Sequence, residues 1–304
     1  MTASQPSVPT NSARFELEEP LPRLAPRAAD SHKNNFGLAL VVGGSRGMTG
    51  AVTMAGLSAL RGGAGLVRLA VPDVCLDVVA GFEPSYMTVA LPCDRAGRMA
   101  ISARSKIFAQ AQTATVVAYG PGTGRSLGLN VLAGWFYQHL ARPMVIDADG
   151  LTALAARPEV LAKPGGPRIL TPHPGEFARL IGKNLEGDDR NLAAVELAAR
   201  CGVVVVLKGH HTWITDGHRR AVNRTGNPGM ATGGSGDVLT GLITALACQG
   251  LAPYEAARLG VYLHGLAGDL AAQELGQVAM IASDLIRYLP QAMRTIAVSG
   301  LPES

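Results

Sequence analysis

Short apolar runs recur along this chain, and each one ends in a loop of glycine, proline and small polar residues. Residues 38–42 read Leu-Ala-Leu-Val-Val, and Gly43-Gly44-Ser45 follow directly. Runs without polar alternation are typical of strands buried on both faces, as in parallel sheets that helices cover on both sides. Similar runs lie at 66–71, 114–119, 143–146, 168–170 and 203–207. The sequence therefore predicts an α/β fold, a three-layer α/β/α sandwich with a mostly parallel central sheet.

The later part of the chain departs from this alternation. Residues 213–215 and 218–222 flank the pair Asp216-Gly217, and an Asp-Gly pair between two such segments is typical of a β-hairpin. From Val238 to about residue 293 the apolar spacing is helical. We therefore expect a late antiparallel hairpin, followed by helices.

The 304 residues suit one large domain. Residues 1–30 are rich in Pro, Ser and Ala without a sustained period, which predicts a partly ordered N-terminal tail. No internal repeat or change of composition follows, so residues 31–304 are expected to form the domain.

Composition excludes several classes of protein. The formal charge of +4 comes from scattered Lys and Arg rather than from a basic run with aromatics, which argues against nucleic-acid binding. No apolar run reaches the roughly 18 residues of a membrane span, and residues 1–30 lack the apolar core of a signal peptide. We expect no membrane association and a cytoplasmic location. Four isolated cysteines agree with a reducing compartment: Cys75, Cys93, Cys201 and Cys248.

A glycine-rich segment precedes the last helical region. Residues 227–237 read Asn-Pro-Gly-Met-Ala-Thr-Gly-Gly-Ser-Gly-Asp, and the helical pattern begins at Val238. A turn of small residues that opens into a helix presents free N–H groups at the positive end of the helix dipole, which suits an anion. The chain contains no Gly-x-x-x-x-Gly-Lys-Ser/Thr motif, so phosphoryl transfer here would not be of the P-loop kind.

Asp237 is the candidate catalytic base, because its carboxylate lies at the edge of this anion site and can take a proton from a hydroxyl. The alternative is an ordinary helix N-cap, a position that Asp favours.

Loops after the other predicted strands carry further candidates. Ligands of parallel sheets bind beyond the carboxyl ends of the strands, so these loops should meet at one cleft. Lys208 emerges at a strand end, where it either meets nucleotide phosphates or is simply exposed. His173 stands between two prolines, which suits either a ligand contact or a helix cap. Of Asp147 and Asp149, one is expected to bind ligand or a hydrated cation and the other to cap a helix near Leu151. Mg²⁺ would suit the phosphates, but its ligands are not identified.

The chain resembles the NAD(P)H-hydrate dehydratase family of the ribokinase-like superfamily. The resemblance spans residues 32 to about 273. The specific segments are Thr171-Pro172-His173-Pro174-Gly175-Glu176 and Asn227 through Asp237; the others are His32-Lys33, Gly43-Gly44-Ser45, Ser58 through Val67, Gly120 through Gly124, Asp147 through Leu151 and Lys208-Gly209. Asn34 and Asn35 depart from the family pattern, which normally has Lys-Gly and a small residue there.

The resemblance implies a repair reaction. NADH and NADPH hydrate spontaneously at the nicotinamide C5–C6 bond to give NADHX and NADPHX, and this family removes the water from the S form. The C6 hydroxyl is phosphorylated by ADP or ATP, ADP giving AMP, and phosphate then leaves. The resemblance also implies a homo-oligomer (a tetramer) and a separate NAD(P)H-hydrate epimerase as functional partner.

The resemblance also assigns roles to residues. Ala51, Gly122, His173 and Asp237 would contact the hydrate. The adenine nucleotide would be held by Lys208, Gly209, His210, His211, Thr212 and Gly236. The backbone amides of Gly234, Ser235 and Gly236 would form the anion hole that stabilises the transferred phosphoryl group.

Two other functions remain open on the residues alone. One is a small-molecule kinase of the same fold, acting on a hydroxyethylthiazole or hydroxymethylpyrimidine, which would use the same anion loop and the same Asp237. The other is a nucleotide-binding regulator without catalysis, which would have no need of a base at Asp237.

Overall fold

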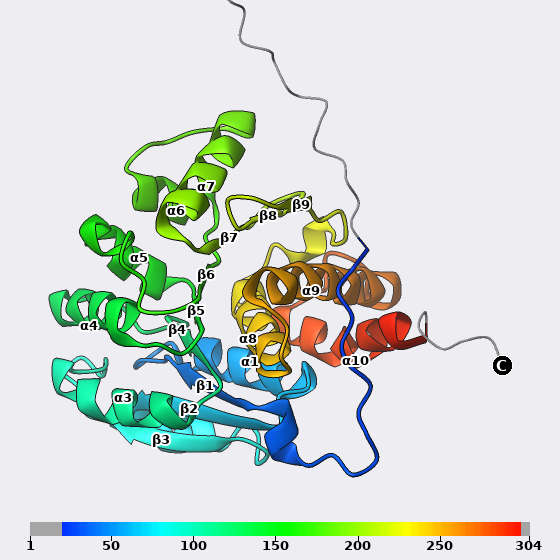
Figure 1. Cartoon of the computed structure of the whole chain (residues 1–304). Helices are drawn as coiled ribbons and strands as arrows, with labels where there is room; N and C mark the ends of the chain where they lie inside the picture. The colour runs from blue at the N-terminus through cyan, green and yellow to red at the C-terminus, as the bar shows by residue number, and fades with distance from the viewer. Residues whose placement is uncertain (1–19, 299–304) are drawn as a thin grey trace, which may run out of the picture.

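Nine strands form one sheet in the computed structural model, which describes residues 20–298 (Figure 1). The strand order is β3-β2-β1-β4-β5-β6-β7-β8-β9. Strands β1 to β7 are parallel, β8 is antiparallel to β7, and β9 is antiparallel to β8. The predicted hairpin is therefore confirmed at the edge of the sheet. The strands are β1 (Leu38–Val42), β2 (Leu66–Pro72), β3 (Met87–Leu91), β4 (Val116–Tyr119), β5 (Met144–Ile146), β6 (Arg168–Leu170), β7 (Val204–Leu207), β8 (Trp213–Thr215) and β9 (Arg220–Val222).

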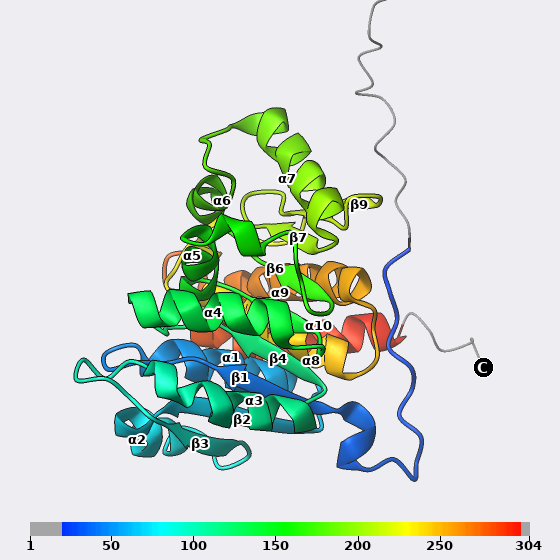
Figure 2. The ribbon, with the colours of Figure 1, turned by 60° about the vertical axis from the view of Figure 1, so that its left-hand side comes forward.

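Helices cover both faces of the sheet, as the apolar strands require. One face packs against α1 (Thr49–Arg61), α2 (Leu76–Ala80), α8 (Ser235–Cys248), α9 (Pro253–Leu275) and α10 (Ala282–Val298). The other face packs against α3 (Arg104–Thr113), α4 (Leu127–His139), α5 (Asp149–Ala155), α6 (Pro174–Ile181) and α7 (Gly187–Cys201), which Figure 2 turns toward the viewer. Short 3₁₀ turns lie at Lys33–Phe36, Asp73–Cys75, Ile101–Ala103, Pro158–Val160 and Pro228–Met230.

Strand β1 shows why its sequence has no polar alternation. Ala39 and Val41 belong to the core on the α1 side, and Leu40 and Val42 belong to the core on the α4 side. All four side chains are fully buried. The predicted three-layer α/β/α sandwich with a mostly parallel sheet is confirmed.

The strand order reverses between β1 and β4. From β1 the chain builds β2 and β3 on one side, and then β4 and the later strands on the other. The loops after β1 and β4 meet there, where the Gly44 amide donates to the Pro121 carbonyl at 2.8 Å. Ligands of open α/β sheets bind at such a switch point, beyond the carboxyl ends of the strands.

Some expected details were wrong or incomplete. Strand β3 and helices α2, α3 and α7 were not expected individually. Met48 occupies the N-cap position of α1, and Thr49 is its first helical residue. The helix expected from Val238 begins at Ser235, and the one expected near Leu151 begins at Asp149.

The expected N-terminal tail lies partly outside the described residues, because 1–19 are not among them. Residues 20–32 contain no helix or strand, but Arg27 donates to the Gly63 carbonyl at 2.7 Å and its guanidinium lies 3.7 Å from the centre of the Phe36 ring. The division of the chain at residue 30 remains a prediction. Between residues 20 and 298, no helix has the length and apolar character to cross a membrane.

Helices α1 and α8 approach closely, and this contact fixes the start of α8 relative to the sheet. Ser58 Oγ donates to the Val238 carbonyl at 2.6 Å. A Cβ added at Gly241 would collide with the Ala55 carbonyl oxygen.

Gly241→Ala should therefore lower the free energy of unfolding by about 1–3 kcal/mol, the usual cost of overpacking a core. Gly128→Ala is the matched control, since a Cβ at this helical glycine meets only ordinary contacts of 3.8 and 3.9 Å. Urea denaturation followed by circular dichroism measures both. Equal stability of the two variants would contradict the close packing of α1 on α8.

Candidate active site

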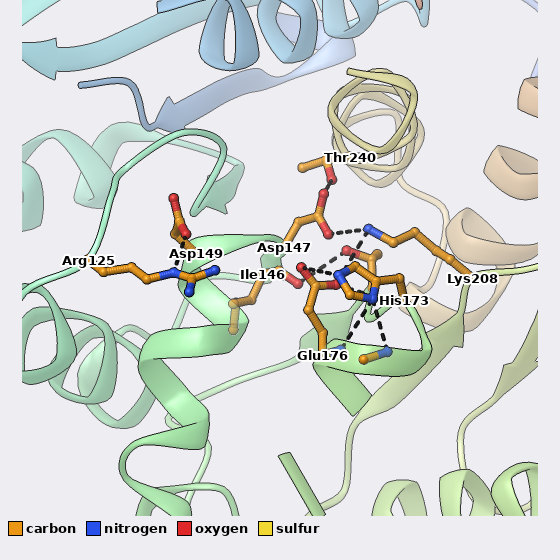
Figure 3. A network of polar contacts seen from close by, with 10 residues as sticks. Arg125, Ile146, Asp147, Asp149, His173, Glu176, Lys208 and Thr240 are labelled. Atoms are coloured by element: carbon orange, nitrogen blue, oxygen red, sulfur yellow. Dashed lines mark hydrogen bonds and ion pairs between the residues drawn. The ribbon is translucent and has the colours of Figure 1, made fainter. Parts of the chain in front are cut away.

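An ion pair joins the ends of β5 and β7. Asp147 follows β5 and Lys208 follows β7, and Lys208 Nζ lies 2.6 Å from Asp147 Oδ1 (Figure 3). Thr240, on α8, donates its hydroxyl to Asp147 Oδ2 at 2.8 Å. The Asp147 side chain is only 2% exposed, so both of its oxygens are satisfied inside the protein. Lys208 is thus part of a buried network and not simply an exposed strand-end lysine.

Helix α6 adds a second carboxylate to this network. Glu176 Oε2 accepts from the His173 amide at 2.8 Å and lies 3.9 Å from Lys208 Nζ. His173 Nδ1 accepts from the amides of Gly175 and Glu176 at 3.0 and 3.3 Å, so the ring caps the helix. An accepting Nδ1 leaves the proton on Nε2 in the neutral ring. Nε2 lies 3.5 Å from Glu176 Oε1, and the side chain as a whole is 51% exposed, so a ligand can still reach the ring. The capping role is confirmed, and it is compatible with the predicted ligand contact.

The N-terminus of α8 faces the same ion pair. Gly234 is the N-cap, at φ 96°, and α8 begins at Ser235. A Cβ added at Gly236 would lie 3.1 Å from Lys208 Nζ and 3.6 Å from Asp147 Oδ2. The first N–H groups of a helix have no partner within the helix, so they can bind an anion here. The expected glycine-rich helix N-terminus is therefore present beside a buried lysine.

Asp237 lies in the first turn of α8, two residues after its start, so the alternative of an ordinary N-cap is wrong. Burial and the negative charge of Asp147 raise the pKa of Asp237 to about 7, against the opposing effect of Lys208. Burial disfavours the charge on Lys208, but Asp147 and Glu176 outweigh it and raise the pKa of this lysine. At neutral pH the cation persists, while Asp237 is poised between its two protonation states. Such a carboxyl suits a general base.

The loops at the switch point bring together two of the predicted substrate residues. A Cβ added at Gly122 would lie 3.0 Å from the Ala51 Cβ, so the backbone of one packs on the side chain of the other. Ser45 Oγ donates to the Gly122 carbonyl at 2.8 Å. Asp149 accepts from the Gly124 amide at 2.9 Å and pairs with Arg125. The expectation that one of the two aspartates caps the helix near Leu151 was wrong, because Ala148 is the N-cap of α5 and no side chain caps this helix.

A cavity of about 540 Å³ opens on the other side of Lys208. It is bounded by two loops, residues 208–212 after β7 and residues 223–231 before α8, and by the facing side of α9. Five predicted nucleotide residues line it in sequence, Lys208 through Thr212, and Gly236 lines it as well. The structure therefore gathers the predicted nucleotide residues around one cavity. Their contact with a nucleotide remains a prediction.

Several residues at this site were not identified from the sequence. Thr240 lies three residues after Asp237 on α8, a spacing that places two side chains on one helix face and could have drawn attention to it. His264 Nε2 donates to the Ser235 carbonyl at 2.9 Å, and burial lowers the pKa of His264 to about 4. Asp269 accepts from the Gly226 amide and from Asn227 Nδ2. His264 and Asp269 lie in α9, in a helical pattern without a local motif.

Metal ligands are not clustered at this site. Within residues 20–298, no group of three His, Cys, Asp or Glu side chains is arranged to hold a metal ion. Both Asp147 oxygens already have partners.

The fold and these loops define the class of protein. The chain matches a solved ribokinase-like superfamily protein from Enterococcus faecalis with a TM-score of 0.76 and 27% identity. The match covers 90% of this chain and 92% of the Enterococcus protein. The chain belongs to the NAD(P)H-hydrate dehydratase family, which matches residues 39–291.

Individual relatives agree with this family. The chain is 45% identical over 292 residues to the bifunctional NAD(P)H-hydrate repair enzyme Nnr of Moorella thermoacetica. This match covers 92% of this chain and 54% of the relative. The chain therefore spans about half the length of such relatives. It is 40% identical to the ADP-dependent (S)-NAD(P)H-hydrate dehydratase of Neisseria meningitidis serogroup B, over 83% of each chain. The ADP/ATP-dependent NAD(P)H-hydrate dehydratase of Bacillus subtilis, co-crystallised with ATP and Mg²⁺, matches with a TM-score of 0.75 and 31% identity, covering 90% of this chain and 94% of its own.

Lys208→Met should destabilise the protein by about 3 kcal/mol, because it leaves the buried Asp147 carboxylate without its cation. Arg287→Met is the control: Arg287 lies 3.8 Å from Glu274 and is 66% exposed, so its loss should cost less than about 1 kcal/mol. Urea denaturation at pH 7.5 compares the two. A Lys208→Met variant as stable as the control would show that the Lys208–Asp147 pair is not needed for the fold.

Proposed function

We propose that this protein dehydrates (S)-NADHX and (S)-NADPHX to NADH and NADPH at the expense of an adenine nucleotide. The observation that carries this proposal is Asp237, a half-buried carboxyl whose pKa is raised to about 7 at a glycine-rich helix N-terminus. A base and an anion site in one helix turn suit the transfer of a phosphoryl group to a hydroxyl.

The reaction begins with activation of the substrate. Asp237 takes the proton from the hydroxyl on C6 of the hydrated nicotinamide, and the oxygen attacks the terminal phosphorus of ADP. The phosphorus–oxygen bond to AMP breaks, and a phosphate ester forms on C6. Amides of Gly234, Ser235 and Gly236 stabilise the charge on the transferred group.

Elimination then restores the reduced cofactor. The C6–O bond breaks with release of inorganic phosphate, and C5 loses a proton as the C5–C6 double bond forms. Hydroxide is a poor leaving group and phosphate a good one, which is why a phosphoryl-transfer fold can carry out a dehydration. The net reaction converts the hydrate and ADP into NADH or NADPH, AMP and phosphate.

Substrate and nucleotide occupy opposite sides of the Lys208–Asp147 pair in this proposal. Ala51, Gly122 and His173 contact the hydrate, which is supported by the packing of Ala51 on Gly122 and by the 51% exposure of the His173 side chain. Lys208 through Thr212 and Gly236 hold the nucleotide, which is supported by their place around the 540 Å³ cavity.

Magnesium fits this site as a companion of the nucleotide rather than of a protein cage. Mg²⁺ is commonly bound through one or two carboxylates together with phosphates and water. Glu176 is the carboxylate near Lys208 that would hold the ion, since Asp147 is fully engaged and Asp237 serves as the base. When bound, the ion would neutralise the charge of the phosphates.

The remaining predictions belong to the same proposal. The protein acts as a homo-oligomer, a tetramer, in the cytoplasm, where its four free cysteines remain reduced. A separate NAD(P)H-hydrate epimerase supplies the S form from the R form. The kinase alternative is not favoured, because the family and the relatives described above are NAD(P)H-hydrate dehydratases or repair enzymes.

Absorbance at 340 nm tests this function. Purified protein, Mg²⁺ and NADHX are mixed, and ADP or ATP is added in separate cuvettes. We expect a nucleotide-dependent rise as NADH forms, with ADP the better donor. No rise with either nucleotide on fresh S hydrate would overturn the proposal.

Asp237→Asn should lower kcat by about 10²- to 10⁴-fold, the usual loss for a general base, and should leave ADP binding intact. Calorimetric titration with ADP and the 340 nm assay separate these effects. Because the pKa of Asp237 is raised in the folded protein, wild type loses stability as the pH rises from about 4 through 7 and this carboxyl ionises. At pH 8 the uncharged Asp237→Asn variant should therefore be no less stable than wild type. Near-wild-type turnover would show that Asp237 is not the base.

Two His173 variants separate its cap from its ligand contact. His173→Asn keeps a side-chain acceptor for the helix amides, whereas His173→Ala costs about 1 kcal/mol of capping as well. Both should raise KM for the hydrate more than the Kd for ADP, and only His173→Ala should lower the melting temperature. Equal losses of hydrate and ADP binding would remove His173 from the substrate side.

A further inference from the structure

Three arginines surround the loops of the switch point, and the proposed reaction does not use them. Arg46 follows β1, Arg98 lies in the turn after β3, and Arg125 follows β4. The Arg46 amide donates to the Gly97 carbonyl at 3.0 Å, and Arg98 Nη1 donates to the Arg125 carbonyl at 2.6 Å. We call these three residues the arginine rim. Its backbone is held in place by its own contacts.

Two members of the rim keep most of their guanidinium free. Arg98 is occupied by Asp94, at 2.8 Å, and by the Arg125 carbonyl. Arg125 uses its Nε toward Asp149, at 3.2 Å, and its side chain is 67% exposed. Arg46 is exposed, and its side chain has no ion pair within residues 20–298. The rim therefore offers Arg46 and the terminal nitrogens of Arg125 to an anion.

The rim lies on the substrate side of the reaction centre. Asp149, which holds both Arg125 and the Gly124 amide, is two residues from Asp147. Figure 3 shows Arg125 and Asp149 on one side of Asp147 and Lys208 on the other. The loop that carries Gly122, against which Ala51 packs, runs directly into Arg125.

The size of the substrate decides what the rim meets. The hydrate is a dinucleotide, so a pyrophosphate and a second nucleoside extend from the nicotinamide that reacts at Asp237. In the proposed function, the adenine nucleotide occupies the cavity beyond Lys208 during the reaction. The rest of the substrate must therefore leave the centre in the opposite direction, past the loops after β1 and β4.

Resting on the proposed function, we propose that Arg46 and Arg125 bind the pyrophosphate of the dinucleotide. Guanidinium groups form paired, charge-assisted hydrogen bonds with phosphate oxygens, and two of them straddle the switch point where a dinucleotide crosses the sheet edge. Arg98 is a positioning residue, because it holds the Arg125 backbone in place.

Binding of NADH, followed by its fluorescence, tests this inference without turnover. Arg46→Ala and Arg125→Ala should each weaken NADH and NADPH binding about tenfold, and equally for the two. Arg46→Lys and Arg125→Lys should recover part of the loss. The Kd for ADP should not change, and kcat/KM for NADHX should fall in step with NADH binding.

Arg287→Ala is the matched control, because this arginine is 66% exposed, lies in α10 and is 3.8 Å from Glu274. It should change none of these constants. Unchanged NADH binding in both rim variants would overturn the inference. So would a loss confined to NADPH, which would point to its 2′-phosphate, or an equal loss of ADP binding. Weaker NADH binding in the rim variants of a protein that does not convert NADHX would reject the proposed function and retain the rim.

Discussion

The ion pair between Lys208 and Asp147 is the contact on which the site depends. It joins the ends of two strands that are separated in the sheet by β6, and Thr240 ties α8 to the same carboxylate. Once this pair is buried, the charge of Lys208 has to be matched and the next carboxyl is exposed to negative charge. Asp237 is that carboxyl, and its own burial, together with the negative charge of Asp147, raises its pKa to about 7. The same contact thus holds the fold together and prepares a base.

The reversal of the strand order gives the site its two sides. The loops after β1 and β4 form one side, where Gly44 meets Pro121, and the loop after β7 with the N-terminus of α8 forms the other. A phosphoryl group that moves between two ligands needs both of them bound at once, on either side of a fixed cation. Lys208 lies between the 540 Å³ cavity and the carboxylates, as the proposed transfer requires.

The sequence was sufficient for every strand except β3 and for the glycine-rich loops, because buried strands and glycine-rich turns leave local patterns. It also predicted which loops would gather, since parallel strands end at one edge. It did not separate Asp147 from Asp149, whose partners Lys208 and Arg125 come from different loops. Thr240, His264 and Asp269 act through contacts between distant segments and carry no local pattern. Asp237 was expected at a helix cap or as a base, and only the position of Gly234 as the cap separates these two roles.

The ionisation of Asp237 itself tests this account most directly. Protein labelled with ¹³C at aspartate carboxyls can be titrated by NMR, and the Asp237 signal is assigned as the one missing from Asp237→Asn. The account predicts a midpoint close to pH 7. A midpoint near 4, the ordinary value for aspartate, would show that the buried network does not act on this carboxyl and would contradict its role as a poised base.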